Sequence, residues 1–299
     1  MKINTRPALA SIILAIVALS ATAQTVVPTK IRVNGVELTY IERGQGEPLI
    51  LLHGGQGDYR SWEPQMAALS PRFRVISYSR RYNYPNDNPI TSNKHSAYIE
   101  AEDLAAFIRK LKLQRVHLVG TSIGAFTALI LAVKHPEMVR SLVLAEPPVH
   151  DWVKDTQAYK DFMTGAWNPA AAAFRAGDDS GGMRFLINAF GGAGTFENLP
   201  AAAVTVAMQN SRFFKAATLS SNRAFELSKE KVRSLKMPIL LIRGENTILM
   251  HKLIIEELKR VLPGAEQAII PKAGHGSARE NPQAFNDAML KFLNLQTPK

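Results

Sequence analysis

Residues 116–125 read VHLVGTSIGA, and this stretch decides the fold. Its first part, 116–119, is a short apolar run of the kind that forms a buried parallel strand. The pattern G-x-S-x-G follows at 120–124, directly before an alanine-rich helical stretch at 123–134. That pattern between a strand and a helix predicts a sharp turn that exposes the hydroxyl of Ser122 as a nucleophile. The alternative interpretation is a tight turn that carries an inert serine.

Strands and helices alternate in both directions from this turn. Residues 31–42 alternate around Asn34-Gly35, which is a strong hairpin signal. Apolar runs predict further strands at 48–52, 74–78, 139–145, 239–243 and 268–270, and helical spacing is found at 96–111, 250–261 and 282–293. This alternation predicts an α/β fold, with a mostly parallel central sheet and helices on both faces.

The strand rhythm is lost between residues 147 and 235. Helices are predicted at 169–174 and 201–208, and the glycine-containing stretches 177–182 and 191–194 are predicted to be flexible joints. A segment of this length is too long for a loop in a compact domain. We therefore predict a helical lid, 147–235, inserted between two core segments, 24–146 and 236–299. Because ligands bind at the carboxyl edge of open α/β sheets, this lid is expected over that edge.

The first 23 residues have the features of a signal peptide. Lys2 and Arg6 precede an apolar run from Ala8 to Leu19, and Ala21-Thr22-Ala23 matches an A-x-A cleavage site. The run is short for a membrane span. We predict an exported protein, periplasmic in a bacterium or secreted, with no stable membrane anchor after cleavage; a retained anchor is the alternative.

Composition excludes several classes of protein. Apolar residues make up 46% and charged residues 20%, which is typical of a globular chain and not of a disordered or coiled-coil one. The net charge of +11 comes from scattered basic residues, so we predict no nucleic-acid binding. Cysteine is absent, which excludes disulfides, thiolate catalysis and Cys-ligated zinc. We also find no metal-binding motif and no phosphate loop, and the sequence does not indicate an oligomeric state.

Two further loops complete a candidate site at the carboxyl edge. Ala273-Gly274-His275-Gly276 follows the last strand, where a histidine can serve as general base to the serine. His53-Gly54-Gly55 follows an earlier strand, where a glycine-rich turn can aim a backbone N–H at an oxyanion. We predict the N–H groups of Gly55 and Ile123 as the two donors, and a structural role for the side chain of His53.

With these motifs the chain resembles an α/β-hydrolase-fold serine hydrolase. The resemblance rests on HGGQGDYRSW (53–62), GTSIGA (120–125), LVLAEPP (142–148) and AGHGSARENP (273–282), which occur in the order of that family. It implies Ser122 as nucleophile, His275 as base, a lid at 147–235 and no cofactor. A serine at this turn, where related dehalogenases and epoxide hydrolases carry aspartate, argues against those two activities.

The sequence departs from the family pattern at the acid of the triad. Many relatives carry an aspartate a few residues after the strand at 239–243, where this chain has Thr247. A minority place the acid after the previous strand, which here is Glu146. A carboxylate is needed to orient the histidine and stabilise its protonated form. We predict Glu146 in this role, with Glu245, or no functional acid, as the alternatives.

Three residues are weaker candidates for substrate contact. Arg80 and Arg81 follow the strand at 74–78, and an arginine fork can bind a carboxylate. Such a pair is more often a structural turn. Trp62 can line an apolar pocket, although core packing is the commoner role for a buried tryptophan. For Trp167 the sequence favours neither of these two roles.

These observations predict a serine hydrolase that cleaves a carboxylic ester of a small molecule through a Ser-His-Glu triad and an acyl-enzyme. Two alternatives stay open. One is a hydrolase-fold binding or receptor protein with little turnover, which the missing aspartate at 247 favours. The other is a cofactor-free enzyme of another class on the same fold, such as a perhydrolase or a C–C hydrolase.

Overall fold

The computed structural model describes residues 27–222 and 227–296. The predicted signal peptide lies outside these residues. Within them, eight strands form one sheet in the order β1-β2-β4-β3-β5-β6-β7-β8. The strands are β1 (Thr29–Val33), β2 (Val36–Arg43), β3 (Glu47–Leu52), β4 (Phe73–Tyr78), β5 (Val116–Thr121), β6 (Val139–Ala145), β7 (Ile239–Gly244) and β8 (Glu266–Ile270).

The sheet is antiparallel at one edge and parallel elsewhere. β1 and β2 form the predicted hairpin, whose turn places Asn34 and Gly35 at φ 45° and 78°. β2 then pairs antiparallel with β4, and every later pair is parallel. Parallel neighbours require helical crossovers, which is why helices alternate with these strands. The predicted α/β sheet is therefore confirmed.

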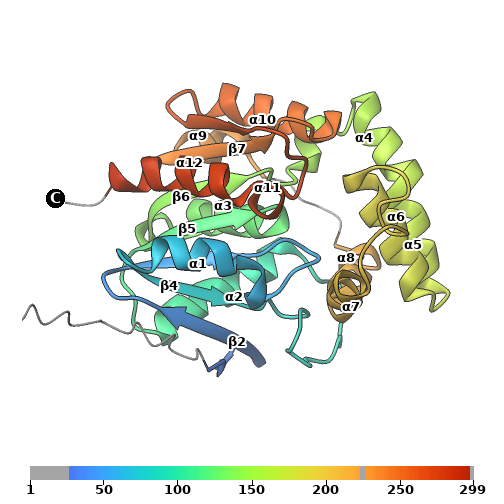
Figure 1. The fold of residues 1–299 in the computed structure, drawn as a ribbon, viewed down its shortest axis with the longest axis horizontal. Coiled ribbons are helices and arrows are strands. Elements are labelled where there is room, and N and C mark those ends of the chain that lie inside the picture. Colours follow the sequence, from blue (N-terminus) through green and yellow to red (C-terminus); the bar gives the residue numbers. More distant parts are fainter. Residues whose placement is uncertain (1–26, 223–226, 297–299) are drawn as a thin grey trace, which may run out of the picture.

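Helices cover both faces of the sheet (Figure 1). One face packs against α2 (Ala97–Lys110), α3 (Ile123–Lys134), α9 (Lys229–Arg233) and α10 (Leu249–Val261), and the other against α1 (Glu63–Leu69) and α12 (Pro282–Asn294). Successive residues of β3 alternate between these two cores: Ile50 and Leu52 join the first, and Leu49 and Leu51 the second. Because both faces are buried, these strands read as continuous apolar runs.

Most of the segment between β6 and β7 is helical and lies beyond the ends of the strands, at the right of Figure 1, whereas its last helix, α9, packs against the sheet. The segment contains α4 (Gln157–Phe162), a π-helical turn (Met163–Trp167), α5 (Asn168–Arg175), α6 (Asp179–Gly191), α7 (Ala201–Gln209) and α8 (Ser211–Thr218). A separate apolar cluster holds α5, α6 and α8 together. We call residues 147–235 the inserted segment.

One expectation about the inserted segment is wrong. The predicted joint at 177–182 is a turn only at its start, where Gly177 has φ 82°, because Gly181 and Gly182 lie inside α6. Asp178 caps that helix by accepting a hydrogen bond from the N–H of Gly181. A Cβ on Gly182 would collide with the ring of Phe174, so this glycine serves helix packing rather than flexibility.

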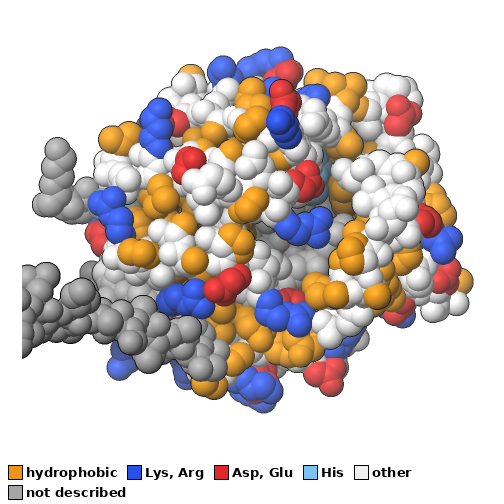
Figure 2. Space-filling view, in the orientation of Figure 1, with side chains coloured by type: hydrophobic (Ala, Val, Ile, Leu, Met, Phe, Trp, Pro, Cys, Tyr) orange, Lys and Arg blue, Asp and Glu red, His pale blue; other side chains and the backbone are white. Residues whose placement is uncertain are grey.

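The surface is hollowed where the inserted segment meets the rest of the molecule (Figure 2). On the face shown, Lys and Arg side chains are interspersed with acidic and uncharged ones rather than gathered into one patch. Within the described ranges, no helix combines the length and the apolar character that a membrane crossing requires.

Candidate active site

The turn at Ser122 joins β5 to α3, and two glycines make it possible. Ser122 has φ 51° and ψ −127°, in a sparsely populated region that costs a serine about 1–3 kcal/mol. A Cβ on Gly120 would collide with the backbone at the start of α3, and one on Gly124 with the carbonyl oxygens of Leu52 and His53. The side chain of Ser122 makes no capping hydrogen bond to α3, so its hydroxyl is not engaged by the start of that helix.

A carboxylate and a histidine meet at the same edge of the sheet. Glu146 follows β6, and His275 lies in the loop after β8. Oε2 of Glu146 accepts a hydrogen bond of 2.7 Å from Nδ1 of His275. The same carboxylate accepts from Thr247 Oγ1 and from the backbone N–H of Gly244, each at 2.7 Å. A histidine held in this way through Nδ1 presents Nε2 for proton transfer.

Glu146 is ionised in this setting although it is almost completely buried. Burial by itself raises its pKa, but the nearby Nδ1 of His251, the hydrogen bond from His275 and the charges of both rings outweigh burial and lower the pKa well below its usual range. The backbone of Glu146 also has a positive φ of 48°, so the strand-end turn that aims the carboxylate carries strain.

Thr247 accounts for the departure from the usual family pattern. Its side chain is buried, and its hydroxyl donates to the carboxylate of Glu146. An aspartate at this position would bring a second carboxylate against the first, and like charges at that distance repel. Glu245, the alternative acid, is exposed and accepts a hydrogen bond from the backbone N–H of Lys272. The structure brings Glu146, not Glu245, to His275.

Sequence reasoning missed two rings that surround His275. His251, on α10, lies with its ring centroid 4.2 Å from that of His275, and Phe190, at the end of α6, stacks on His275 at 4.8 Å. Burial and the nearby charge of His275 lower the pKa of His251 to about 4, so this ring is neutral at neutral pH. No motif marks either residue, because the inserted segment and α10 meet only in the folded chain.

The glycine loop predicted as an oxyanion site lies against the serine. A Cβ on Gly54 would be 3.5 Å from Cβ of Ser122. A Cβ on Gly55 would collide with the rings of Phe213 and Phe214 on α8, so only glycine fits beneath the inserted segment. Ile123 is the first residue of α3, where backbone N–H groups have no partner within the helix.

Arg80 is committed to structural contacts rather than open to a ligand. Its guanidinium is buried, donates to Glu100 at 2.6 Å and to the carbonyl of Gly54 at 3.2 Å, and lies over the ring of Phe213. Its backbone N–H donates to Nε2 of His53, whose Nδ1 in turn donates to the carbonyl of Gly54. Arg80 and His53 therefore hold the glycine loop in place through their hydrogen bonds to the carbonyl of Gly54.

The other two weak candidates also have partners away from the serine. Arg81 donates two hydrogen bonds of 2.8 Å to Asp103 on α2. Trp62 is 1% exposed and packs against Phe285 of α12. These positions favour structural roles over the substrate contacts predicted from sequence. Trp167 belongs to an aromatic cluster in the inserted segment with His150 and Phe162.

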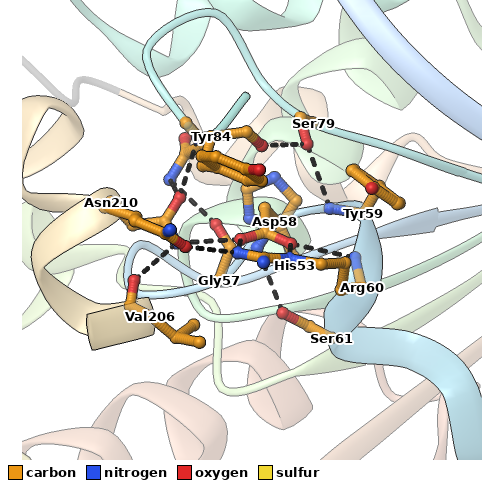
Figure 3. Close-up of polar contacts among 12 residues, drawn as sticks. His53, Gly57, Asp58, Tyr59, Arg60, Ser61, Ser79, Tyr84, Val206 and Asn210 are labelled. Atoms are coloured by element: carbon orange, nitrogen blue, oxygen red, sulfur yellow. Dashed lines mark hydrogen bonds and ion pairs between the residues drawn. The ribbon is translucent and has the colours of Figure 1, made fainter. Parts of the chain in front are cut away.

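A buried polar network joins the glycine loop to the inserted segment (Figure 3). Asn210, between α7 and α8, donates to Oδ2 of Asp58 at 3.0 Å and accepts from the backbone N–H of Tyr84 at 3.0 Å. Asn83 donates to the carbonyl oxygens of Gly55 and Gly57. The loop that carries Gly55 is thus held to α7 and α8 by hydrogen bonds.

Comparison with known proteins identifies the family. A family model described as alpha/beta hydrolase fold matches residues 47–282, which is most of the chain.

The chain belongs to the α/β hydrolase fold family. This confirms the family, the fold and the general class of hydrolase that the motifs indicated.

Curated relatives of this α/β hydrolase include several kinds of enzyme. The 2-(acetamidomethylene)succinate hydrolase of Mesorhizobium japonicum is 25% identical over 280 residues, covering 89% of this chain and 94% of that protein. The carboxylesterase YbfK of Bacillus subtilis is 26% identical over 248 residues, covering 82% and 79%. A thermophilic esterase from Thermogutta terrifontis has a similar structure, with a TM-score of 0.74 at 22% identity over 91% of this chain and 99% of that one.

Proposed function

We propose that this α/β hydrolase cleaves a carboxylic ester of a small molecule with Ser122 as nucleophile, His275 as general base and Glu146 as the acid of the triad. The observation that carries the proposal is the 2.7 Å hydrogen bond from His275 Nδ1 to a buried, ionised Glu146. A carboxylate in this position selects the tautomer of His275 whose Nε2 accepts a proton. The strained turn at Ser122, on the same edge, supports the role of nucleophile.

The reaction proceeds in two halves. Nε2 of His275 takes the proton of the Ser122 hydroxyl as its oxygen attacks the ester carbonyl, and Glu146 stabilises the imidazolium that forms. The N–H groups of Gly55 and Ile123 donate to the oxyanion, and the alkoxide leaves with the proton from His275. Water activated by His275 then attacks the acyl-enzyme and releases the acid, which restores the serine.

The receptor alternative loses its main support in this arrangement. It drew on the absence of an aspartate at 247, whereas Thr247 donates to Glu146 and so assists a carboxylate in another position. The relatives named as hydrolases, including a carboxylesterase, also support turnover. These relatives act on different bonds, so experiment must decide which bond this enzyme cleaves. We propose an ester; cleavage of a C–C bond and formation of a peroxide product are the competing activities on this fold.

The test requires no knowledge of the natural substrate. The purified protein is treated with a fluorophosphonate, and the intact mass is compared with that of Ser122→Ala. We expect one adduct that is lost in the variant, together with hydrolysis of p-nitrophenyl acetate that is lost in parallel. Adduct formation in well-folded Ser122→Ala protein would contradict the assignment of the nucleophile. An unreactive, well-folded wild type would favour the receptor interpretation.

Export to the periplasm is a separate proposal that rests on residues 1–23 alone. Intact mass of the protein recovered from the periplasm of an expressing bacterium tests it. Cleavage after Ala23 is the expected result, and an uncleaved cytosolic product would contradict it.

A further inference from the structure

Three groups that can ligate a metal ion converge at the acid of the proposed triad. Oε2 of Glu146 lies 2.7 Å from Nδ1 of His275 and 3.1 Å from Nδ1 of His251. Ligand atoms of these three residues all lie within 4.8 Å of one another. The residues come from three separate parts of the fold: the end of β6, the loop after β8, and α10.

The triad does not account for His251. Its side chain is 2% exposed, and its Nδ1 lies 3.1 Å from Oε2 of Glu146. Among the described residues, that nitrogen has no hydrogen-bond partner. An unpaired polar atom in a buried place is costly, so native proteins rarely retain one without a reason. A ligand between the two imidazoles and the carboxylate would satisfy it.

We propose that Glu146, His251 and His275 form a binding site for a late first-row divalent cation such as Zn²⁺, and that occupancy of the site switches the hydrolase off. Two imidazoles and one carboxylate are a ligand set that this class of ion prefers. Neighbouring ligands of a tetrahedral zinc ion with Zn–N bonds near 2.05 Å lie about 3.3 Å apart. The observed spacings of 2.7 and 3.1 Å need to open by about 0.6 and about 0.2 Å to reach that value.

The surroundings of the carboxylate suit this role as well. Oε1 of Glu146 accepts from the backbone N–H of Gly244 and Oε2 from the hydroxyl of Thr247, and these two hydrogen bonds fix the direction of the carboxylate. Outer hydrogen bonds of this kind orient metal ligands and strengthen binding. Phe190, stacked on the rings of both histidines, shields the site on the side of the inserted segment.

Inhibition follows from the tautomer of His275, and this step rests on the proposed function. A neutral imidazole has one N–H, and in the triad that proton is on Nδ1. A metal ion bound to Nδ1 requires the proton to be on Nε2 instead. The ring is still neutral and no proton is released, but Nε2 is then a donor and cannot accept the proton of Ser122. The ion thereby blocks the base without touching the serine.

The test uses the full-length mature protein, freed of metal by a chelator and titrated with ZnCl₂ by calorimetry. We expect one ion per chain, with binding weakened about tenfold or more in His251→Phe, which keeps the aromatic packing but lacks the ligand atom. His251→Asn is the second variant, in case the first unfolds. His135→Asn is the matched control, because His135 is partly exposed beside Glu102 and Glu137 and can collect zinc adventitiously.

A second readout links binding to chemistry. The rate of fluorophosphonate labelling at Ser122 should fall about tenfold or more at saturating Zn²⁺ and recover with EDTA, each protein being compared with its own metal-free rate. Unchanged binding in both folded His251 variants, loss of binding in His135→Asn, or no binding at all would overturn the proposal. A chain that binds Zn²⁺ through His251 but never labels would retain the metal site and contradict the proposed hydrolase instead.

Discussion

The hydroxyl of Thr247 donates a hydrogen bond of 2.7 Å to Oε2 of Glu146, the same oxygen that receives Nδ1–H of His275. A residue at the position where many relatives carry the triad aspartate thus supports a glutamate that arrives from the neighbouring strand. In the proposed triad the acid comes from the end of β6, and Thr247, after β7, is a hydrogen-bond donor to it.

Replacing Thr247 tests this relationship. We expect Thr247→Val, which keeps the shape but removes the donor, to lower kcat by a factor that corresponds to about 1.5–3 kcal/mol, the value of a hydrogen bond to a charged group. Thr247→Ser should retain most of the activity. Steady-state hydrolysis of p-nitrophenyl acetate gives both values, and full activity in Thr247→Val would show that the hydroxyl is dispensable.

The identity of the acid is tested by two glutamine substitutions. Glu146→Gln should lower kcat about a thousandfold or more, because an amide cannot stabilise the imidazolium and favours the wrong tautomer. Glu245→Gln is the matched control and should have little effect, since its carboxylate is exposed and binds only a backbone N–H. The reverse ranking in the same ester assay would move the acid to Glu245.

The network around Asn210 should contribute to both stability and catalysis. Asn210→Ala leaves the backbone N–H of Tyr84 without its partner and removes one hydrogen bond from Asp58, which keeps those from Arg60; we expect a cost of about 1–3 kcal/mol of unfolding free energy. Since the network also holds the loop of Gly55, we expect kcat to fall while KM changes little. Gln209→Ala, which removes only an exposed contact with Arg60, is the control in urea unfolding and in the ester assay.

The buried pair of Arg80 and Glu100 should make stability depend on acid pH. Burial raises the pKa of Glu100, but the charge of Arg80 and the nearby Nε2 of His95 outweigh it and lower the pKa from 4.5 to about 2. A lowered folded-state pKa means stability that is present above about pH 4.5 and is lost as the pH falls toward 2. Urea unfolding between pH 6 and 2.5 should show this loss.

Glu100→Gln provides the comparison for that prediction. The variant should be less stable at neutral pH by about 3 kcal/mol, because it leaves the guanidinium of Arg80 buried without its counter-charge. Its stability should then fall less steeply with acid than that of the wild type. Parallel curves for the two proteins would show that other carboxylates dominate the acid response.

Local sequence patterns were sufficient for much of the fold. The apolar runs of the parallel strands are continuous because helices bury both faces, and Asn34-Gly35 marks a turn that needs two positive φ angles. The glycines at 120 and 124 predicted the turn at Ser122 for the reason that the structure displays, a close backbone approach. Each of these signals depends on neighbours within a few residues, so it survives in the linear sequence.

Local sequence patterns could not predict the contacts between segments that are distant in the chain. The sequence alone left Glu146 and Glu245 in competition. Both the end of β6 and the turn after β7 contact the histidine loop, but only the carboxylate of Glu146 bonds Nδ1 of His275, whereas the exposed carboxylate of Glu245 accepts from the backbone N–H of Lys272. The pairing of Arg80 with Glu100, and the placing of His251 and Phe190 around His275, likewise depend on how helices from different parts of the chain pack on the sheet. The sequence therefore determined the fold and the turn that carries Ser122. Tertiary packing alone decided the partners of His275, because a side chain's partners are set by distances in space that its own segment does not encode.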